Sequence, residues 1–293
     1  MTEDDHIRYD VSEGIATITI NRPDKMNSVT YPMLHAILAS FDKTDADDAV
    51  RAVIITGAGD RAFCAGADLG AAGGDSFNYK DRADMRERRM INGVHPDTGG
   101  LIALRIFRSL KPVIGAINGV AVGFGASSIL PMDVRIAADS ARFRYIYTRI
   151  GLVPEAASAW FLPRIVGLPN ALEWAMSGRM ISAQEALDRG LVRSLHPVGE
   201  LQDAARAVAR NFIDGGAPVS IALTRQMLWQ AMTVGHPMEA HKIDSRGVAA
   251  RGRAADIKEG LAAFGARRTP EFPDKVSSDM PDFFPWWEEP EFE

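Results

Sequence analysis

Two glycine-containing turns carry the groups in this sequence best suited to chemistry, and those groups belong to the main chain. Residues 63–69 follow the apolar run 52–56, and residues 123–128 follow the apolar run 112–117. Small residues let a backbone approach a ligand closely, and two convergent N–H groups can stabilise an oxyanion. Each turn leads into a helix-like segment, whose N-terminus favours negative charge. The turns therefore predict a site that polarises a carbonyl group.

The segments around these turns predict an α/β core. Residues 15–20 alternate as a strand does, and the apolar spacing from Met33 to Phe41 predicts an amphipathic helix before the next strand. Further strands are expected at 112–117, 134–137 and 142–147, a charged cover at 70–100, and a helical layer from about 201 to 264. The aromatic tail after residue 272 is expected to dock on the rest of the chain.

Composition excludes several classes of protein. With 293 residues, 46% of them hydrophobic, the chain can bury one large core or two modest ones. A net charge of −5 without a broad basic surface argues against nucleic acid as a partner. The single Cys64 is expected to be a small buried residue rather than a nucleophile, and the six histidines lack metal-ligand spacing. Without a signal segment or an apolar run of ~18 residues, the chain is expected to be cytoplasmic and not membrane-bound.

The order of motifs resembles the crotonase superfamily, also called the enoyl-CoA hydratase/isomerase family, from about residue 10 to residue 272. The motifs that carry this resemblance are 21–23 with 25–28, 62–69, 111–119 running into 123–125, 151–155, 163–167, 183–187 with 190–192, and 259–264. A dinucleotide site at 123–125 is rejected, because the full glycine spacing is missing.

The resemblance implies a fold and an assembly. It predicts an α/β spiral of ββα units over residues 1–198, with the acyl-CoA site, and a helical oligomerisation region over 199–272. The acidic, aromatic segment 273–293 follows the part that carries the resemblance and is expected to be a tail. Trimers, often paired into hexamers, are expected. The implied substrate is a coenzyme A thioester, with no permanently bound cofactor.

The resemblance also implies site residues. The amides of Ala67 and Phe124 would form the oxyanion hole, although glycine is more usual than Phe124 and its ring would narrow the acyl pocket. The residues expected around the coenzyme A thioester are Lys25, Asn27, Ala65, Gly66, Asp68, Leu69, Gly125 and Arg267. Lys25 and Arg267 could equally be solvated surface side chains, and Asp68 is favoured as a cap for a following helix.

Hydratases of this family hold water between two glutamates, and neither glutamate is present. Ser127 stands at the first position and Tyr147 at the second. Their hydroxyl groups cannot serve as ready carboxylate bases at neutral pH. Tyr147 is favoured as a packed strand residue lining the substrate pocket, and Ser127 as a residue at a helix start.

Glu155 is the remaining acid in a suitable place. In the isomerase branch a glutamate at this position acts as one base that removes an α proton and returns it to the γ carbon. The other interpretation is the first turn of a helix with Pro154 at its first position. The sequence favours an enoyl-CoA isomerase with Glu155 as base. A hydratase with another acid/base set and a noncatalytic acyl-CoA-binding protein stay open.

Overall fold

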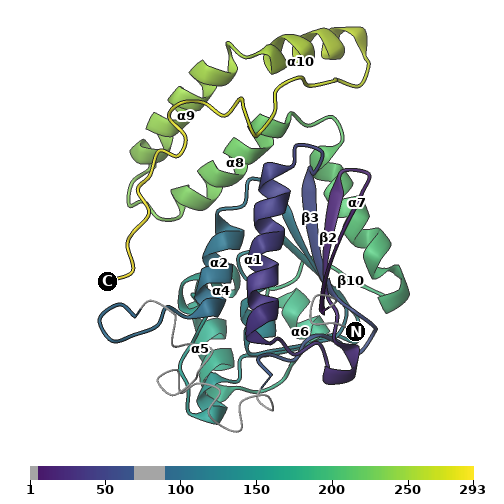
Figure 1. Cartoon of the computed structure of the whole chain (residues 1–293), viewed down its shortest axis with the longest axis vertical. Coiled ribbons are helices and arrows are strands. Elements are labelled where there is room, and N and C mark those ends of the chain that lie inside the picture. The colour runs from purple at the N-terminus through teal and green to yellow at the C-terminus, as the bar shows by residue number, and fades with distance from the viewer. Residues whose placement is uncertain (1–5, 69–89) are drawn as a thin grey trace.

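Ten strands form two sheets in the described residues, 6–68 and 90–293, of this computed structural model (Figure 1). The larger sheet runs in the order β1 (Ile7–Ser12), β2 (Ile15–Ile20), β3 (Ala52–Gly57), β5 (Val113–Ile117), β7 (Val134–Ala138) and β10 (Leu195–His196). The smaller sheet runs in the order β4 (Ala62–Cys64), β6 (Val120–Val122), β8 (Arg142–Arg144) and β9 (Ile181–Ser182). Neighbouring strands are parallel except β1 with β2 and β8 with β9.

The helices follow the strands in sequence. They are α1 (Tyr31–Ala46), α2 (Thr98–Phe107), α3 (Phe124–Ser127), α4 (Ser158–Val166), α5 (Leu168–Ser177), α6 (Ala183–Asp188), α7 (Leu201–Ile213), α8 (Pro218–Ala231), α9 (Pro237–Arg251) and α10 (Ala255–Ala266). Short 3-10 helices cover Pro23–Lys25, Tyr147–Ile150 and Val198–Glu200. The predicted α/β spiral is confirmed, since β3–β4, β5–β6 and β7–β8 each place one strand in the larger sheet and the next in the smaller.

Glycines and an asparagine form the corners between the two sheets. A Cβ on Gly119 would lie 2.4 Å from the carbonyl oxygen of Arg61, so only glycine fits where β5 turns into β6. The side chain of Asn118 accepts a hydrogen bond from the amide of Gly57 at 3.0 Å and donates one to the carbonyl oxygen of Gly59 at 2.7 Å. These bonds hold consecutive corners together.

The central strands β3 and β5 of the larger sheet are buried on both faces. All residues of β3 and β5 are buried, as expected for parallel strands that are covered on both sides. α1 packs on β1 and β2 and against α2, whereas α7 packs across β3, β5 and β7. In Figure 1, α1 crosses in front of the sheet. The expected strand 142–147 is shorter than predicted, because β8 ends at Arg144 and a 3-10 helix begins at Tyr147.

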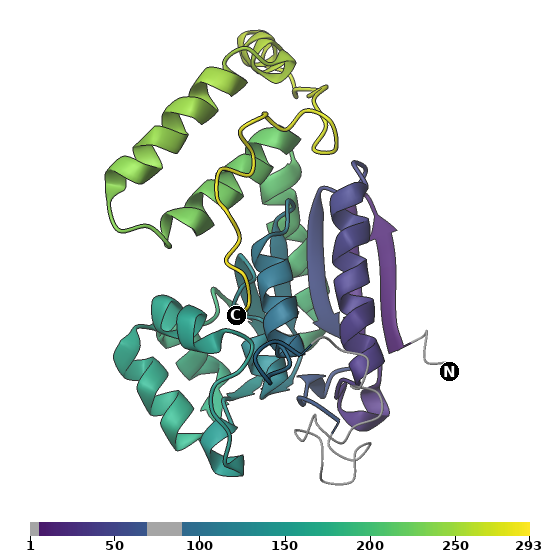
Figure 2. The same cartoon turned by 60° about the vertical axis from the view of Figure 1, so that its left-hand side comes forward.

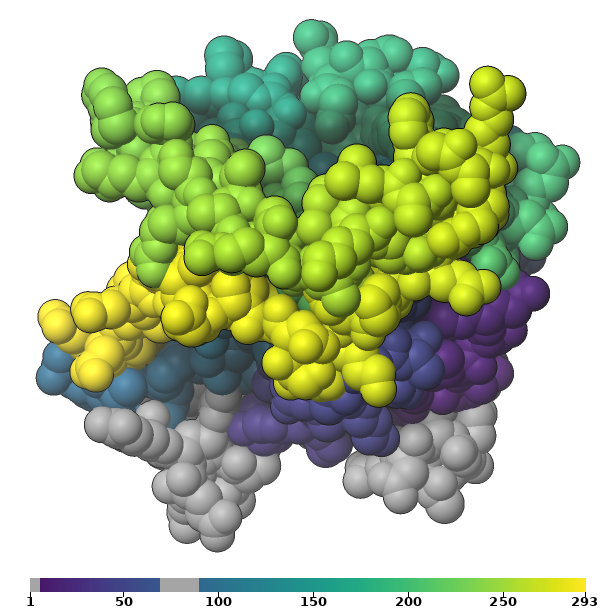
Figure 3. Space-filling model, turned by 90° about the horizontal axis from the view of Figure 1, so that it is seen from above, coloured from purple at the N-terminus to yellow at the C-terminus, as the bar shows by residue number. Residues whose placement is uncertain are grey.

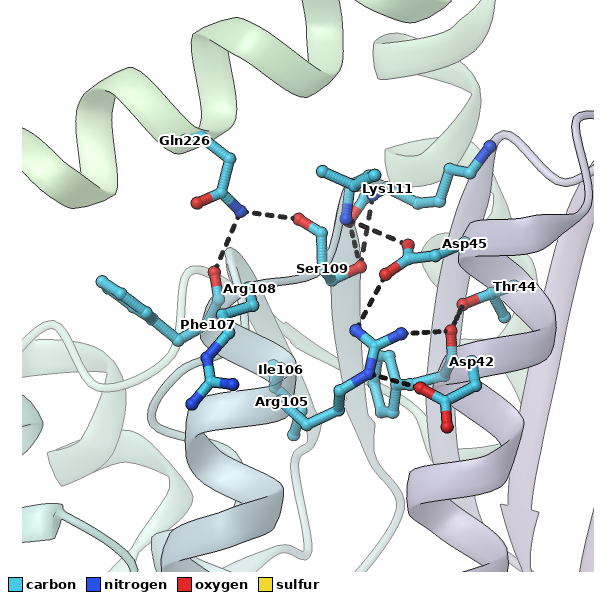
Figure 4. A network of polar contacts seen from close by, with 12 residues as sticks. Asp42, Thr44, Asp45, Arg105, Ile106, Phe107, Arg108, Ser109, Lys111 and Gln226 are labelled. Atoms are coloured by element: carbon cyan, nitrogen blue, oxygen red, sulfur yellow. Dashed lines mark hydrogen bonds and ion pairs between the residues drawn. The ribbon is translucent and has the colours of Figure 1, made fainter. Parts of the chain in front are cut away.

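Polar contacts fix α2 between α1 and α8 (Figure 4). The guanidinium of Arg105 pairs with Asp42 and Asp45, both at 2.8 Å, and donates to the carbonyl oxygen of Phe41 at 2.7 Å. On the side of α2 that faces α8, the side-chain amide of Gln226 donates to the carbonyl oxygen of Phe107 at 3.1 Å. Because its C-terminal half is held from two sides, α2 presents its N-terminus in a defined place.

Helices α8, α9 and α10 project from the part of the molecule that holds the two sheets. The tail, which follows α10, runs back toward that part (Figure 2). Seen from above, α9, α10 and the tail cover much of that face of the molecule (Figure 3). The guanidinium of Arg251 bridges Asp256 at 2.8 Å and Asp274 at 2.6 Å. The amide of Ser277 donates to Asp48 at 3.1 Å. The expected docking of the tail is thus confirmed.

Candidate active site

The two glycine turns lie at the carboxyl ends of neighbouring parallel strands. Residues 65–68 follow β4, residues 123–128 follow β6, and the two strands pair directly. A Cβ on Gly125 would lie 2.0 Å from the carbonyl oxygen of Cys64, and one on Gly66 would lie 3.0 Å from that of Val122. Both glycines therefore allow a backbone approach that a side chain would prevent.

Among the backbone hydrogen bonds between described residues, none uses the amide of Ala67 or of Phe124. The amide of Val29 donates to the carbonyl oxygen of Gly66 at 2.9 Å, and that of Asp68 donates to the carbonyl oxygen of Val29 at 2.9 Å. Ala67, between them, directs its N–H away from Val29, because successive amides alternate along an extended chain. Phe124 begins α3, where an N–H has no acceptor within the helix.

Glu155 lies between the 3-10 helix at Tyr147–Ile150 and α4. The interpretation of this segment as a first helical turn was wrong, because Ala156 and Ala157 have φ values of 55° and 52° and α4 begins only at Ser158. Left-handed backbone cannot continue into a right-handed helix. The acid is therefore held in an irregular corner rather than in a helix.

Burial raises the pKa of Glu155 to about 7; the nearby Ser127 hydroxyl partly offsets this, and the negative charge of Asp97 adds to it. Its Oε1 is buried, and it accepts no hydrogen bond from the Ser127 hydroxyl.

Cys64 is fully buried, as predicted, and burial raises the pKa of its thiol to about 12, with Glu155 contributing. The acid therefore lies close to the first glycine turn.

Ser127 and Tyr147, which the sequence predicts at the hydratase glutamate positions, bind each other. The hydroxyl groups of Ser127 and Tyr147 lie 2.6 Å apart, and that of Tyr147 donates to Ser158 at 3.0 Å. Ser127 also donates to the carbonyl oxygen of Gly123 at 3.0 Å, four residues earlier. The expected helix-start role of Ser127 is wrong, since it ends α3. The expected strand position of Tyr147 is also wrong, since β8 ends at Arg144 and Tyr147 begins a 3-10 helix. Burial raises the pKa of Tyr147 above its ordinary value, with Glu155 contributing.

Comparison with known proteins matches nearly the whole chain to one family. The sequence model of the family described as enoyl-CoA hydratase/isomerase matches residues 10–275. The chain belongs to the enoyl-CoA hydratase/isomerase family. It is 34% identical to an enoyl-CoA hydratase of Alternaria alternata, with 90% of this chain and 85% of the relative aligned. It is also 34% identical to the 1,2-epoxyphenylacetyl-CoA isomerase of Escherichia coli, over 90% of this chain and 97% of that protein.

Solved structures show the same fold. A probable enoyl-CoA hydratase/isomerase from Mycobacterium abscessus superposes with a TM-score of 0.79 at 31% identity, covering 92% of this chain and 99% of that one. The enoyl-CoA hydratase from Bacillus anthracis superposes with a TM-score of 0.80 at 30% identity, covering 91% and 98%. Both comparisons place nearly the whole chain within the crotonase fold.

Three more residues expected at the site of this crotonase are Asn27, Ala65 and Lys25, and the structure shows the contacts of the first two. The side chain of Asn27 is buried and donates to the carbonyl oxygens of Ala58 and Ala62 at 2.9 and 2.7 Å, so it holds the end of β3 near β4. The amide of Ala65 donates to the carbonyl oxygen of Met26 at 3.0 Å. The side chain of Lys25 is exposed.

The expected roles of Asp68 and Arg267 stay predictions. Asp68 pairs with Arg22 at 2.9 Å, and the helix it was expected to cap lies beyond the described residues, as does Leu69. Arg267 is exposed and ends α10, which lies at the far end of the molecule from α5 in Figure 1.

Sequence reasoning missed two residues that touch Glu155 or its neighbour. Asp97 accepts a hydrogen bond from the amide of Ala156 at 2.9 Å, and a Cβ on Gly99 would lie 2.6 Å from Oε2 of Glu155. The pattern from Asp97 to Gly100 is a recognisable helix start, but nothing local in it indicates a partner near residue 155.

Over 6–68 and 90–293, no group of acids, histidines or cysteine is arranged to hold a metal ion. In the same ranges, no helix has the length and apolar character needed to cross a membrane.

Proposed function

We propose that this family member is an enoyl-CoA isomerase in which Glu155 moves the proton and the amides of Ala67 and Phe124 stabilise the thioester oxygen. The observation that carries this proposal is the buried carboxylate of Glu155 with a pKa of about 7. A base with a pKa near the working pH is ionised often enough to take a proton and acidic enough to give it back.

The reaction balances with one base. The carboxylate of Glu155 removes a proton from the α carbon of a 3-enoyl-CoA, and the electron pair of that C–H bond moves into the thioester carbonyl. The resulting dienolate carries its negative charge on the oxygen, where two backbone N–H groups are expected to be worth ~3 kcal/mol each. Its collapse takes the same proton from Glu155 onto the γ carbon, and the double bond ends beside the carbonyl.

Two observations favour isomerisation over hydration. Ser127 and Tyr147, at the positions of the hydratase glutamates, are buried and hydrogen-bonded to each other. Burial raises the pKa of Tyr147, so it is neutral at physiological pH and does not act as a base on water. A hydratase would need another acid/base set, and a noncatalytic acyl-CoA-binding protein would have no use for Glu155.

Purified protein incubated with 3-enoyl-CoA and with 2-enoyl-CoA separates these three functions. We expect conversion of 3-enoyl-CoA to 2-enoyl-CoA without a hydroxyacyl product, and a loss of at least ~10²-fold in kcat for Glu155→Gln, because the base is removed. Glu239→Gln, on the exposed face of α9, is the matched control and keeps wild-type turnover.

Other outcomes reassign the protein. Full turnover by Glu155→Gln overturns the isomerase assignment. A hydroxyacyl product that disappears in Tyr147→Phe identifies a hydratase that uses the Ser127–Tyr147 pair. Tight thioester binding without any product identifies a binding protein.

A further inference from the structure

Asp97 lies just before α2, and its carboxylate accepts three hydrogen bonds. Its Oδ1 accepts from the amide of Gly99 at 3.1 Å, and its Oδ2 accepts from that of Gly100 at 2.8 Å. These two bonds cap the helix. The third bond, from the amide of Ala156 to Oδ2 at 2.9 Å, leaves the helix and reaches the residue next to Glu155.

That third bond falls on a backbone corner that alanine adopts with difficulty. Ala156 and Ala157 both have left-handed φ values, 55° and 52°. Such a conformation persists only where the surroundings hold it in place. Asp97 supplies one such restraint, because it binds the amide of Ala156 from a helix that is itself fixed by α1 and α8.

The first turn of α2 also leaves room for the carboxylate of Glu155. A Cβ on Gly99 would lie 2.6 Å from Oε2 of Glu155 and 3.2 Å from the Cβ of Ala156. Gly99 therefore leaves the space that the carboxylate occupies. The backbone of Glu155 is held by Asp97 through Ala156, and its side chain lies against the first turn of α2.

The groups that face Glu155 come from several elements. They are the Cys64 thiol at the end of β4, the Ser127 hydroxyl on α3, the Tyr147 phenol and the Asp97 carboxylate. Cys64, Ser127 and Tyr147 are neutral at pH 7. In the ranges that the structure describes, Asp97 is thus the negative charge that acts on Glu155.

We propose that Asp97 is a positioning residue for the proton transfer: its carboxylate holds the corner at Glu155 and Ala156 against α2 and thereby aims the Glu155 carboxylate. This inference rests on the proposed function of Glu155 as the base. If Asp97 serves only as a helix cap, its loss lowers stability and leaves the chemistry of bound substrate unchanged.

Two variants of Asp97 test the length of its side chain and its negative charge separately. Asp97→Ser keeps a helix cap, but the shorter side chain does not reach Ala156. We expect its kcat to fall ~10- to 100-fold with KM changed less than about twofold, because a displaced base costs turnover rather than binding. Asp97→Asn keeps the size and removes the charge, and it retains one of the two acceptor oxygens. We expect the acidic limb of its kcat–pH profile to move to lower pH, since a neighbouring negative charge no longer opposes ionisation of Glu155.

Ser182→Ala is the control, because Ser182 caps α6 through the amide of Glu185 at 3.1 Å and makes no contact with Glu155. It is expected to lower stability and leave kcat and the pH profile unchanged. If Glu155→Gln abolishes isomerisation while both Asp97 variants keep the wild-type kcat and pH profile, the positioning role is wrong and the proposed function stands. If Glu155→Gln itself keeps turnover, the proposed function fails first.

Discussion

The ionisation of Glu155 sets how activity depends on pH. Burial holds its pKa at about 7, so the reactive carboxylate disappears in acid. We expect kcat for isomerisation to fall about tenfold per pH unit below that value and to level off above it. Steady-state rates measured over a range of pH test this. A kcat that stays constant from about pH 5 to about pH 9 is incompatible with Glu155 as the base.

The same burial makes the protein less stable as pH rises. The pKa of Glu155 is about 7 when folded and 4.5 ordinarily, so between these values the folded state binds more protons than the unfolded state. Stability from this group is complete below pH 4.5 and is lost as pH rises through about 7. Glu155→Gln should therefore be more stable than wild type above neutrality, by about 3 kcal/mol, and equal to it in acid. Urea unfolding on both sides of the interval measures this difference; an equal gap at all pH values contradicts it.

Gly99 should be essential for activity rather than for folding. In Gly99→Ala the new Cβ displaces the movable end of Glu155, 2.6 Å away, and alanine favours the helix. We expect kcat to fall at least about tenfold without loss of stability. Gly100→Ala, whose Cβ would meet Asp97 Oδ2 at 3.4 Å, is the matched control. Equal activity of the two variants would show that the carboxylate does not need the space at Gly99.

At the strand ends, the approach of β4 to α3 depends on Gly125. Its added Cβ would lie 2.0 Å from the backbone oxygen of Cys64, which cannot move as a flexible side chain can. We expect Gly125→Ala to lower the free energy of unfolding by more than about 2 kcal/mol. Gly265→Ala in α10, with open space around it, is the control. Denaturation curves that coincide for the two variants would contradict the close packing of these turns.

The order of elements could be predicted from the sequence, whereas the local geometry at the acid could not. Apolar runs correctly placed β2, β3, β5 and β7, and the glycine-containing segments correctly placed the two turns, whereas the strand expected at 142–147 ends at Arg144. Pro154 indicated a helix start, but the left-handed backbone of Ala156 and Ala157 pushed that start to Ser158, and alanine gives no signal for it. The contact from Asp97 to Ala156 spans 59 residues, and local patterns carry no information over such a distance.

Across the whole chain, the tail is tied to the helical layer by a charge cluster. Arg251 lies between Asp256 and Asp274, and the side chains of Arg251 and Asp274 are only 17% and 12% exposed. We expect Asp274→Asn to destabilise the protein by about 1–3 kcal/mol, because a largely buried arginine loses one of its partners. Glu239→Gln removes an exposed pair with Lys242 and should have no measurable effect. Thermal melts compare the two; equal melting temperatures would show that the tail contributes nothing through this contact.

The assembly predicted from the family resemblance stays a prediction. Large apolar side chains on α8, α9 and α10, such as Leu228, Val248 and Phe264, are exposed in the single chain. Exposed apolar surface of this extent is typical of a protein interface. The trimers and hexamers expected for residues 199–272 would cover such a surface, and sedimentation of the purified protein measures which of them forms.

The most direct measurement is a structure of Glu155→Gln with a bound 3-enoyl-CoA. We predict that the thioester oxygen accepts hydrogen bonds from the amides of Ala67 and Phe124, and that side chain 155 lies beside both the α and the γ carbon of the acyl group. A thioester oxygen bound elsewhere, or an α carbon that faces a different acid, would contradict the mechanism.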